Sequence, residues 1–335
     1  MIDRKEEDIM KKWPADWSEP LVSIRCITYN HEPYIAQALE GFIMQETDFP
    51  FEIVVHDDAS TDKTADIIRE YERKYPRIIK AIYETENQYS KKDGSLARIV
   101  NSACTGKYTA FCEGDDYWID SYKLRKQVAV MEQNPSVGLV YTNRLFLDNA
   151  TGKYSFKSWI KPEDATPLAI IEDRNCIHML TVMVRKEIIQ NRPLLPRDCF
   201  QGDIYTFLYA MGKYKCIGLD DVTGVYRVLT ESASHNKRFS KSIQFQSGIA
   251  HLKLHFLKKD IVSDPIKTKY TSWNDVILCK YFLYTNQFDR FCSALSDVAG
   301  STLSSKLKAQ YIIFKILNNK LLFKMAHSLF RTLKK

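Results

Sequence analysis

Three acidic residues stand close together in Glu113-Gly-Asp115-Asp116, directly after an apolar run that is typical of a buried strand. Gly114 lets the chain turn sharply. Glu113 and Asp115 are separated by one residue, so their side chains can face the same way. Hard cations such as Mg²⁺ and Mn²⁺ take carboxylate oxygens together with phosphate oxygens and water. The stretch therefore suits a cation that neutralises a diphosphate, although an ordinary acidic surface turn has the same composition.

A second acidic pair, Asp57-Asp58, also follows a predicted strand, residues 51–56. A carboxylate at this place can accept a hydrogen bond from the N–H of a nucleotide base or from a ribose hydroxyl. The alternative is a helix cap, because Asp-Ala-Ser-Thr-Asp is well suited to start a helix. The two roles are compatible.

The elements around these residues alternate between strands and helices. Residues 21–27, 51–56, 78–83 and 108–112 are predicted strands, and the segments between them carry apolar residues at helical spacing. This alternation predicts βαβ units and a mostly parallel sheet. Ligands bind beyond the carboxyl ends of such strands, so we expect residues 28–31, 57–58 and 113–116 to share one rim.

The second half of the chain has a mixed pattern. Residues 137–141, 179–184 and 224–228 are predicted strands, and residues 203–212 a short helix. Beyond Phe239 the pattern is helical to the end.

Three stretches together resemble the family 2 glycosyltransferases, which have the GT-A fold. They are Val22-Ser-Ile with Thr28-Tyr-Asn-His31, then Ile53 to Asp62, then Glu113 to Trp118. The similarity covers residues 21–146 and continues more weakly to about Ser234. The resemblance implies an α/β class with a Rossmann-like, mostly parallel sheet flanked by helices. We expect an N-terminal extension over 1–19, a GT-A domain over 20–240 and a helical region over 241–335.

The resemblance also implies roles for single residues. The donor is expected to be a nucleotide-diphosphate-sugar and the cofactor Mg²⁺ or Mn²⁺. Asp58 resembles the acid that binds the base or ribose, and Tyr29 a residue beside the base. Asp115 resembles the metal ligand. Glu113 stands where the family usually has Asp, so its longer side chain contacts either the metal or the ribose or a metal-bound water.

An inverting transfer needs a carboxylate that deprotonates the acceptor hydroxyl. Gln201-Gly-Asp203 stands where the family usually has an acidic pair ending in Asp, which makes Asp203 the expected base. Capping of the predicted helix 203–212 is the alternative.

Other candidates for the site come from weaker family matches and, for three basic residues of one loop, from their charge alone. Arg227 is expected to pair with an acid or approach the phosphates. Leu229 replaces a His that many members carry, and His235 either substitutes for it or is a surface histidine. His178 matches an acceptor-side segment of some members. Lys91, Lys92 and Arg98 either meet the pyrophosphate or form an exposed basic loop.

The net charge and the cysteine content indicate which partners and which cellular compartment to expect. The 335 residues carry a net charge of +7, but eight basic residues and no acid follow Asp297, which leaves about −1 for the rest. We therefore expect no nucleic-acid partner. Eight cysteines without a CxxC pair indicate reduced thiols, hence a cytoplasmic protein. The charged N-terminus lacks a signal-peptide core, and no run of about 18 apolar residues suggests a membrane span.

The basic tail, residues 306–335, carries Ile313, Leu317, Leu321 and Met325 at four-residue steps among lysines. Such a helix either lies on an anionic membrane or packs on its own domain with a solvated lysine face. A peripheral position on the inner face of the cell membrane would suit a lipid-linked acceptor, which is common in the family.

The expected function is metal-dependent, inverting transfer of a hexosyl group to an acceptor hydroxyl in surface polysaccharide or glycolipid assembly. The acceptor would be a sugar or a lipid-linked sugar. One alternative is a nucleotidyltransferase acting on sugar phosphates, but such enzymes need a Gly-rich basic loop after the first strand. Another is a catalytically inactive polysaccharide-assembly binding module, which the retained Glu113, Asp115 and Asp203 disfavour.

Overall fold

The structure is a computed structural model. It describes residues 4–156, 166–171, 177–193, 195, 199, 201–229, 239–257, 264–298 and 305–333. Two compact units divide the chain. The first comprises Met1–Ala169, Asn175–Leu194 and Thr206–Val228, and the second comprises Ile170–Arg174, Leu195–Tyr205 and Leu229–Lys335. The predicted domain limits, with a helical region from residue 241, stay a prediction.

A nine-stranded sheet forms the first unit, in the order β3-β2-β1-β4-β8-β6-β9-β5, with β7 paired to β6. The strands are β1 Val22–Thr28, β2 Phe51–Asp57, β3 Ile79–Tyr83, β4 Tyr108–Phe111, β5 Tyr117–Trp118, β6 Val137–Asp148, β7 Lys153–Ser155, β8 Met183–Arg185 and β9 Lys215–Val228.

Parallel pairing joins β3, β2, β1 and β4, as the alternation of strands and helices predicts. β1 and β2 are almost entirely buried, which is typical of parallel strands covered on both faces. Antiparallel pairs enter with β8, β5 and β7, while β6 and β9 pair in parallel. The sheet is therefore mixed, with its parallel half beneath the predicted rim.

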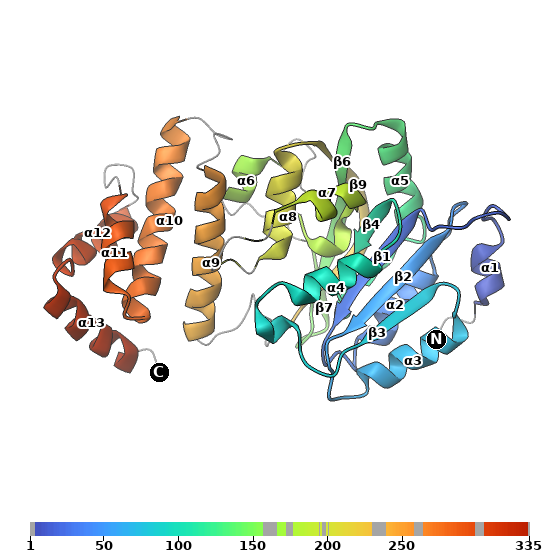
Figure 1. Ribbon diagram of the computed structural model, residues 1–335, viewed down its shortest axis with the longest axis horizontal. Helices are drawn as coiled ribbons and strands as arrows, with labels where there is room; N and C mark the ends of the chain where they lie inside the picture. Colours follow the sequence, from blue (N-terminus) through green and yellow to red (C-terminus); the bar gives the residue numbers. More distant parts are fainter. Residues whose placement is uncertain are drawn as a thin grey trace. The chain divides into compact units, whose positions relative to one another are not determined.

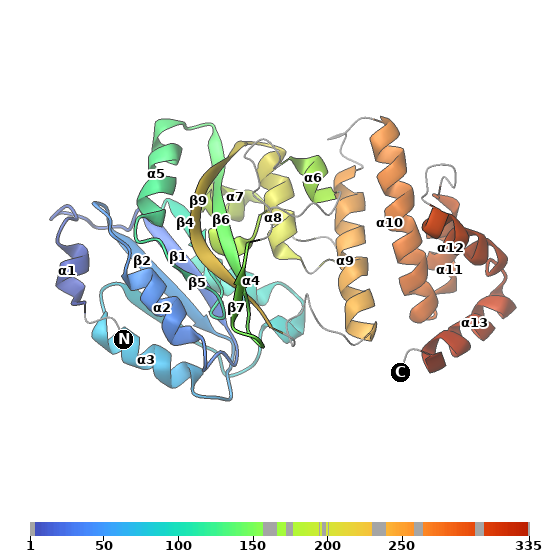
Figure 2. The ribbon, with the colours of Figure 1, turned by 180° about the vertical axis from the view of Figure 1, so that it is seen from behind.

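Helices cover both faces of the parallel half, as the two opposite views show (Figures 1 and 2). α2 Ile35–Ile43, α3 Thr64–Lys74 and α5 Lys123–Gln133 pack into the main core on one face. α4 Ser95–Ala103 covers the other face through Val100. The first unit also holds α1 Glu6–Met10 and α7 Lys186–Asn191, with 3₁₀ turns at η1 Tyr89–Lys91 and η3 Met179–Thr181. Two helices, α6 Pro167–Ile171 and α8 Gly202–Met211, contribute residues to both units.

All three strands predicted for the second half differ from the structure, and the short strands β5 and β7 are not predicted from the sequence. β6 runs to Asp148, beyond the predicted residue 141. β9 begins at Lys215, well before the predicted residue 224, and runs along β6 across register shifts. The predicted strand 179–184 is instead the turn η3 followed by β8. In η3 the carbonyl of Leu180 accepts a hydrogen bond from the Trp118 indole at 2.8 Å.

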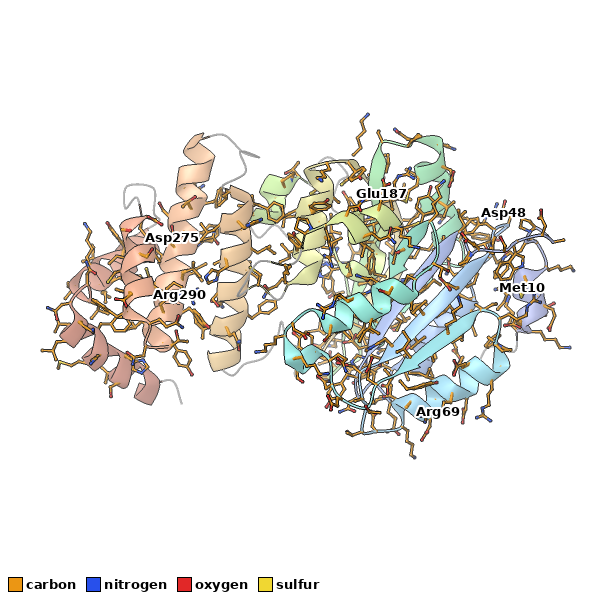
Figure 3. The ribbon with its side chains drawn as sticks, viewed as in Figure 1. Met10, Asp48, Arg69, Glu187, Asp275 and Arg290 are labelled. Carbon is orange, nitrogen blue, oxygen red and sulfur yellow. The ribbon has the colours of Figure 1, made fainter. Side chains whose placement is uncertain are left out.

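The second unit contains α9 Phe239–Leu257, α10 Asp264–Tyr284, α11 Phe288–Ser296, α12 Ser305–Ile316 and α13 Lys320–Leu333. Its core gathers on Phe291, which is fully buried. The guanidinium carbon of Arg290, a residue labelled in Figure 3, lies 4.6 Å from the ring centroid of Phe282 in α10. Among the described residues, no helix combines the length and apolar character that crossing a bilayer requires.

Candidate active site

The three predicted rim segments meet at the carboxyl ends of β1, β2 and β4. The Asp58 N–H donates to the Thr28 carbonyl at 3.0 Å. The Gly114 N–H donates to the Ile27 carbonyl at 2.9 Å. Backbone hydrogen bonds therefore hold the acidic pair and the acidic turn on either side of the end of β1.

The loop after β1 is fastened to the loop after β2 by Asn30. Its backbone is left-handed, with φ of 53°, and its N–H donates to Ser60 Oγ at 2.9 Å. Its side-chain Oδ1 accepts the Thr61 N–H at 2.8 Å. The neighbouring Tyr29 side chain stays 44% exposed, so its ring is open to a ligand at the rim.

The two acids of the Asp57-Asp58 pair have different partners. Asp57 accepts the hydroxyl of Ser60, and burial raises its pKa although these hydrogen bonds oppose the rise. Asp58 is buried, and its two oxygens accept the N–H groups of Gln88 at 2.7 Å and Tyr89 at 3.0 Å. The Thr64 N–H at the start of α3 is instead satisfied by Asp62, so Asp58 orders the loop after β3 rather than capping that helix.

Within the acidic turn, Asp116 points inward and Glu113 and Asp115 are half-buried. Asp116 Oδ1 accepts the N–H of Arg227 in β9 at 2.8 Å. Burial, with Asp115 as its neighbour, raises the pKa of Asp116 well above its usual range. The turn is therefore fixed through Asp116, while Glu113 and Asp115 retain access to solvent.

Gly114 is packed too closely for a side chain. A Cβ built there would lie 2.7 Å from Thr28 Oγ1 and 3.0 Å from His31 Nδ1. Real Cβ atoms essentially never lie closer than 3.0 Å to a neighbour, so the contact with Thr28 excludes a side chain unless the chain moves. The glycine is therefore required because the turn lies directly on the end of β1.

Trp118, just after the turn, is held by a buried polar cluster. Lys123 Nζ lies 4.3 Å from its ring centroid and donates to Gln127 Oε1 at 2.6 Å. Burial lowers the pKa of Lys123 to about 7. Phe42 of α2 packs edge-on against the same indole. The cluster anchors the chain that leaves the acidic turn.

His31 also belongs to the site, although the sequence singles it out only within the motif Thr28-Tyr-Asn-His31. Its Nδ1 is buried and has no hydrogen-bond partner among the described residues. Burial lowers its pKa, although the carboxylates of Asp115, Asp62 and Asp57 oppose the change. Its position after Thr28-Tyr-Asn was the available signal, but one histidine in a loop does not reveal which groups surround it.

The donor groups fit a cation that shares its coordination with a ligand. No described residue donates a hydrogen bond to the Asp115 carboxylate, which leaves its oxygens available. Among the described residues there is no group of three or more His, Cys, Asp or Glu side chains suited to a metal. Mg²⁺ and Mn²⁺ tolerate one or two carboxylates when phosphate oxygens and waters complete the shell. Asp115 and Glu113 fit that arrangement, and they do not fit an all-protein metal cage.

Arg227 lies beside the turn and is buried. Its guanidinium lies 4.9 Å from the ring centroids of both Tyr34 and Tyr117 and donates to Gln37 Oε1. The guanidinium therefore links α2 to β5, and its backbone fixes Asp116.

The basic loop residues are engaged at the surface. Lys91 pairs with Glu86 at 3.3 Å and Arg98 with Asp93 at 3.9 Å. Lys92 has a left-handed backbone, with φ of 54°. A phosphate-binding role for these three residues stays a prediction.

Asp203 belongs to the second compact unit, so its surroundings are described by themselves. It is the second residue of α8 and is half-buried, and burial raises its pKa although hydrogen bonds from backbone N–H groups oppose the rise. His178 belongs to the first unit and packs edge-on against Phe146 and Tyr226. His235 lies outside the described residues.

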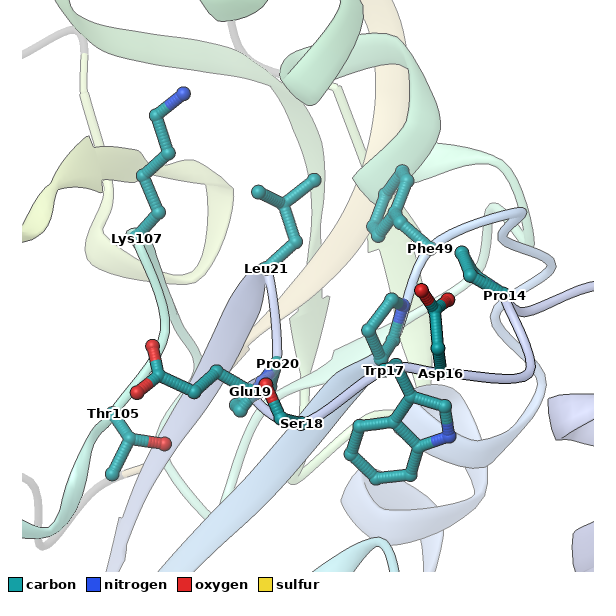
Figure 4. A pocket seen from close by; sticks show the side chains of 11 residues that line it. Pro14, Asp16, Trp17, Ser18, Glu19, Pro20, Leu21, Phe49, Thr105 and Lys107 are labelled. Carbon is teal, nitrogen blue, oxygen red and sulfur yellow. The ribbon is translucent and has the colours of Figure 1, made fainter.

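A pocket of about 570 Å³ lies elsewhere (Figure 4). It is lined by Leu21, Pro50 and Lys107, which precede β1, β2 and β4, together with Trp17 and Phe49. It is therefore at the amino ends of these strands, opposite the rim that carries the acidic turn.

Comparison with known proteins adds a family and a fold. The family model described as Glycosyl transferase family 2 matches residues 23–191. A solved structure of S. aureus TarS 1–349 in complex with UDP-GlcNAc has a TM-score of 0.61 at 17% identity and covers 93% of this chain and 91% of that chain. The mannosyltransferase PcManGT from Pyrobaculum calidifontis, in complex with GDP-Man and Mn²⁺, has a TM-score of 0.51 at 19% identity over 94% and 89% of the two chains. These likenesses confirm the predicted GT-A fold.

Curated relatives match over different lengths. An uncharacterized protein of Mycobacterium tuberculosis is 44% identical over 123 residues, 36% of this chain and 34% of its own. The chain thus spans about a third of the first relatives it matches. TuaG of Bacillus subtilis, a glycosyltransferase named for teichuronic acid biosynthesis, is 28% identical over 73% of this chain and 93% of its own. The Escherichia coli UDP-Glc:alpha-D-GlcNAc-diphosphoundecaprenol beta-1,3-glucosyltransferase WfgD is 25% identical over 65% and 81%.

Proposed function

The chain belongs to glycosyl transferase family 2, and from this premise we propose that it transfers a sugar from a nucleotide-diphosphate-sugar to an acceptor hydroxyl. The observation that carries the proposal is the attachment of two acidic segments to one strand end. Asp58 and Gly114 both donate backbone hydrogen bonds to the last residues of β1. Transfer proceeds with inversion and depends on a divalent cation, as the family resemblance implies.

The donor lies along the rim with its base near Tyr29 and Asp58. The exposed Tyr29 ring offers an apolar face to the base. The Asp58 oxygens already accept two backbone N–H groups, and each carboxylate oxygen retains a further lone pair for the base or ribose. Asp58 therefore both orders the loop at 87–92 and contacts the nucleoside.

Asp115 and Glu113 hold the cation, with Asp115 as the principal ligand. A Mg²⁺ or Mn²⁺ ion bound there supplies neutralisation of the charge on the leaving diphosphate. The residues of the chain position this site: Asp116 anchors the turn, and the Arg227 N–H fixes Asp116. We therefore place Arg227 on the donor side of the site, where its backbone N–H holds the acidic turn that faces the diphosphate.

Asp203 acts as the base that removes the proton from the acceptor hydroxyl. Its support is the motif order of the family together with a pKa that burial raises, because a more basic carboxylate is a stronger proton acceptor. Asp203→Asn should lower turnover by about 10²- to 10⁴-fold and leave donor binding nearly unchanged.

Asp289→Asn is a matched control, since Asp289 is also the second residue of a helix, α11, but is exposed. Turnover close to wild type in Asp203→Asn, or an equal loss in the control, would remove Asp203 from this role.

The acceptor is a sugar or a lipid-linked sugar in polysaccharide assembly. TuaG is named for teichuronic acid biosynthesis, and WfgD is named for transfer to a sugar on diphosphoundecaprenol. A lipid-linked acceptor would bring the protein, expected in the cytoplasm, to the inner face of the cell membrane.

A panel of nucleotide-sugars incubated with the protein and Mn²⁺ tests the proposal. Slow hydrolysis of one donor, with release of the nucleoside diphosphate, is the expected result. Release of pyrophosphate from a nucleoside triphosphate and a sugar phosphate would favour a nucleotidyltransferase. Inertness of the panel, with binding but no turnover, would favour a catalytically inactive binding module.

A further inference from the structure

The two last helices of the chain expose an unusual amount of apolar surface. Eight large aliphatic side chains are exposed among the described residues, and seven of them lie on α12 and α13. The seven are 40–69% exposed: Ile312, Ile313, Ile316, Leu321, Leu322, Met325 and Leu329. Because nearly all of the exposed large aliphatic side chains among the described residues lie on two consecutive helices, these helices are candidates for an interaction site.

Helical geometry collects these side chains into one stripe on each helix. Ile312, Ile313 and Ile316 stand at positions i, i+1 and i+4 of α12. On α13 the exposed residues follow the same spacing from Leu321 to Met325 and Leu329. At about 100° per residue, each stripe spans an arc of roughly 100°.

The opposite sides of the two helices are already occupied. Phe314 of α12 and Phe323 of α13 are buried, and their ring centroids lie 5.5 and 5.0 Å from that of Phe291 in α11. His327 of α13 is also within hydrogen-bond distance, 2.9 Å, of the Leu283 carbonyl of α10. Both helices are therefore packed on the unit, and the apolar stripes face away from α11.

The charge beside the stripes has one sign. Lys315, Lys320 and Lys324 are exposed, and none forms an ion pair with the part of the chain that the structure describes. No acidic residue follows Asp297, whereas eight basic residues do. The surface therefore combines apolar side chains with a positive potential that its own segment does not neutralise.

We propose that α12 and α13 form a preformed docking surface for a bilayer rich in anionic lipids. The apolar stripes enter the interface, and the three lysines meet the lipid phosphates. The two roles expected for this segment, packing on its own domain and binding a membrane, are compatible, because each helix packs through one side and exposes the other. A second copy of the chain fits less well, since the lysines of both copies would face one another. The inference goes beyond glycosyl transfer and does not depend on it.

Co-sedimentation of the full chain with vesicles tests the surface, in the absence of any nucleotide-sugar. Vesicles of phosphatidylcholine alone are compared with vesicles in which about a third of the lipid is phosphatidylglycerol, which gives the membrane a negative surface potential. We expect binding to the anionic vesicles only, weakened by salt. The far-UV circular dichroism should not change on binding, because the helices are already formed.

Two sets of substitutions divide the surface into its components. Each lysine near the surface should contribute about a fivefold gain in affinity. The triple variant Lys315→Gln/Lys320→Gln/Lys324→Gln should therefore bind about a hundredfold more weakly than wild type. Leu321→Gln/Met325→Gln should weaken it by at least roughly tenfold, because buried apolar area is lost. Lys11→Gln/Lys63→Gln/Lys153→Gln is the matched control, since these exposed lysines lie in the first unit, and it should bind as wild type.

The proposal is overturned by equal binding to both vesicles, by no binding at all, or by an equal loss in the control. A dimer in sedimentation velocity that Leu321→Gln/Met325→Gln dissociates, without vesicle binding, would assign the surface to a second copy instead. Both positions are more than half exposed, so the substitutions should not unfold the unit, which the thermal midpoint verifies. Met325→Trp gives a second reading: its added fluorescence should shift to the blue with anionic vesicles, and an unshifted emission counts against insertion.

Discussion

A methyl group added at Gly114 tests whether the acidic turn must lie directly on the end of β1. The new Cβ would lie 2.7 Å from Thr28 Oγ1 and 2.8 Å from Thr28 Cβ, where ordinary contacts begin at 3.4 Å. The turn, or the strand end, must therefore move by about 0.6–0.7 Å to reach ordinary contact.

Such a displacement should be visible both in stability and in activity. Overpacking of a well-packed position costs about 1–3 kcal/mol, so Gly114→Ala should lower the thermal midpoint by several degrees, at about 2–4 °C for each kcal/mol. Because a misplacement of about 1 Å at a site can cost on the order of a hundredfold in rate, kcat/KM should fall by roughly ten- to a hundredfold.

Activity on the donor that the nucleotide-sugar panel identifies is the assay, with differential scanning fluorimetry beside it. Gly212→Ala is the control, because the nearest neighbour of its Cβ would be the Leu208 carbonyl at 3.4 Å. Thr28→Gly removes both clashing atoms, so the double variant should lose less than the sum of the single changes. Wild-type kcat/KM and an unchanged midpoint in Gly114→Ala would refute the packing argument.

Three further predictions concern neighbouring groups. Burial lowers the pKa of Lys123 to about 7, whereas an unfolded lysine titrates near 10.4, so the free energy of unfolding should rise with pH from about 7 to 10 by up to ~1.4 kcal/mol per unit. Lys123→Met should abolish that rise in urea titrations at pH 7 and 9, and parallel slopes in the two proteins would contradict it. Asp58→Asn should cost about 1–3 kcal/mol and increase hydrogen exchange at residues 87–92; unaltered exchange there would show that the carboxylate does not order the loop. Mn²⁺ should bind at least roughly tenfold more tightly in calorimetry when a nucleoside diphosphate is present, and Asp115→Asn should lose this gain; equally tight binding without nucleotide would argue for an all-protein site.

The parallel half of the sheet could be predicted from the sequence because its signals are local. Ile35, Ala38, Leu39, Phe42 and Ile43 recur at helical spacing, and all five are buried in α2. The rim followed from topology alone, since parallel strands that pair in register end together.

The second half could not be predicted in the same way, because its residues are chosen for contacts with residues that lie far away in the sequence. Gly218 in β9 resembles a turn residue, yet it is small because a Cβ there would lie 2.5 Å from the Tyr141 hydroxyl. The first residues of the predicted strand 179–184 instead form the turn η3, in which the Leu180 carbonyl accepts a hydrogen bond from the Trp118 indole. The partners of Asp58 and the burial of His31 likewise depend on loops that only the folded chain brings together.

The hydrogen bond between Asp116 and the Arg227 N–H joins residues that are 111 positions apart. A ribosome that adds about 5–20 residues per second needs on the order of 5–20 s to travel that distance. During this interval the nascent chain already has β1, β2 and β4 but lacks the donor that fixes Asp116. The acidic turn therefore acquires its final geometry late in synthesis, after the strands that carry it.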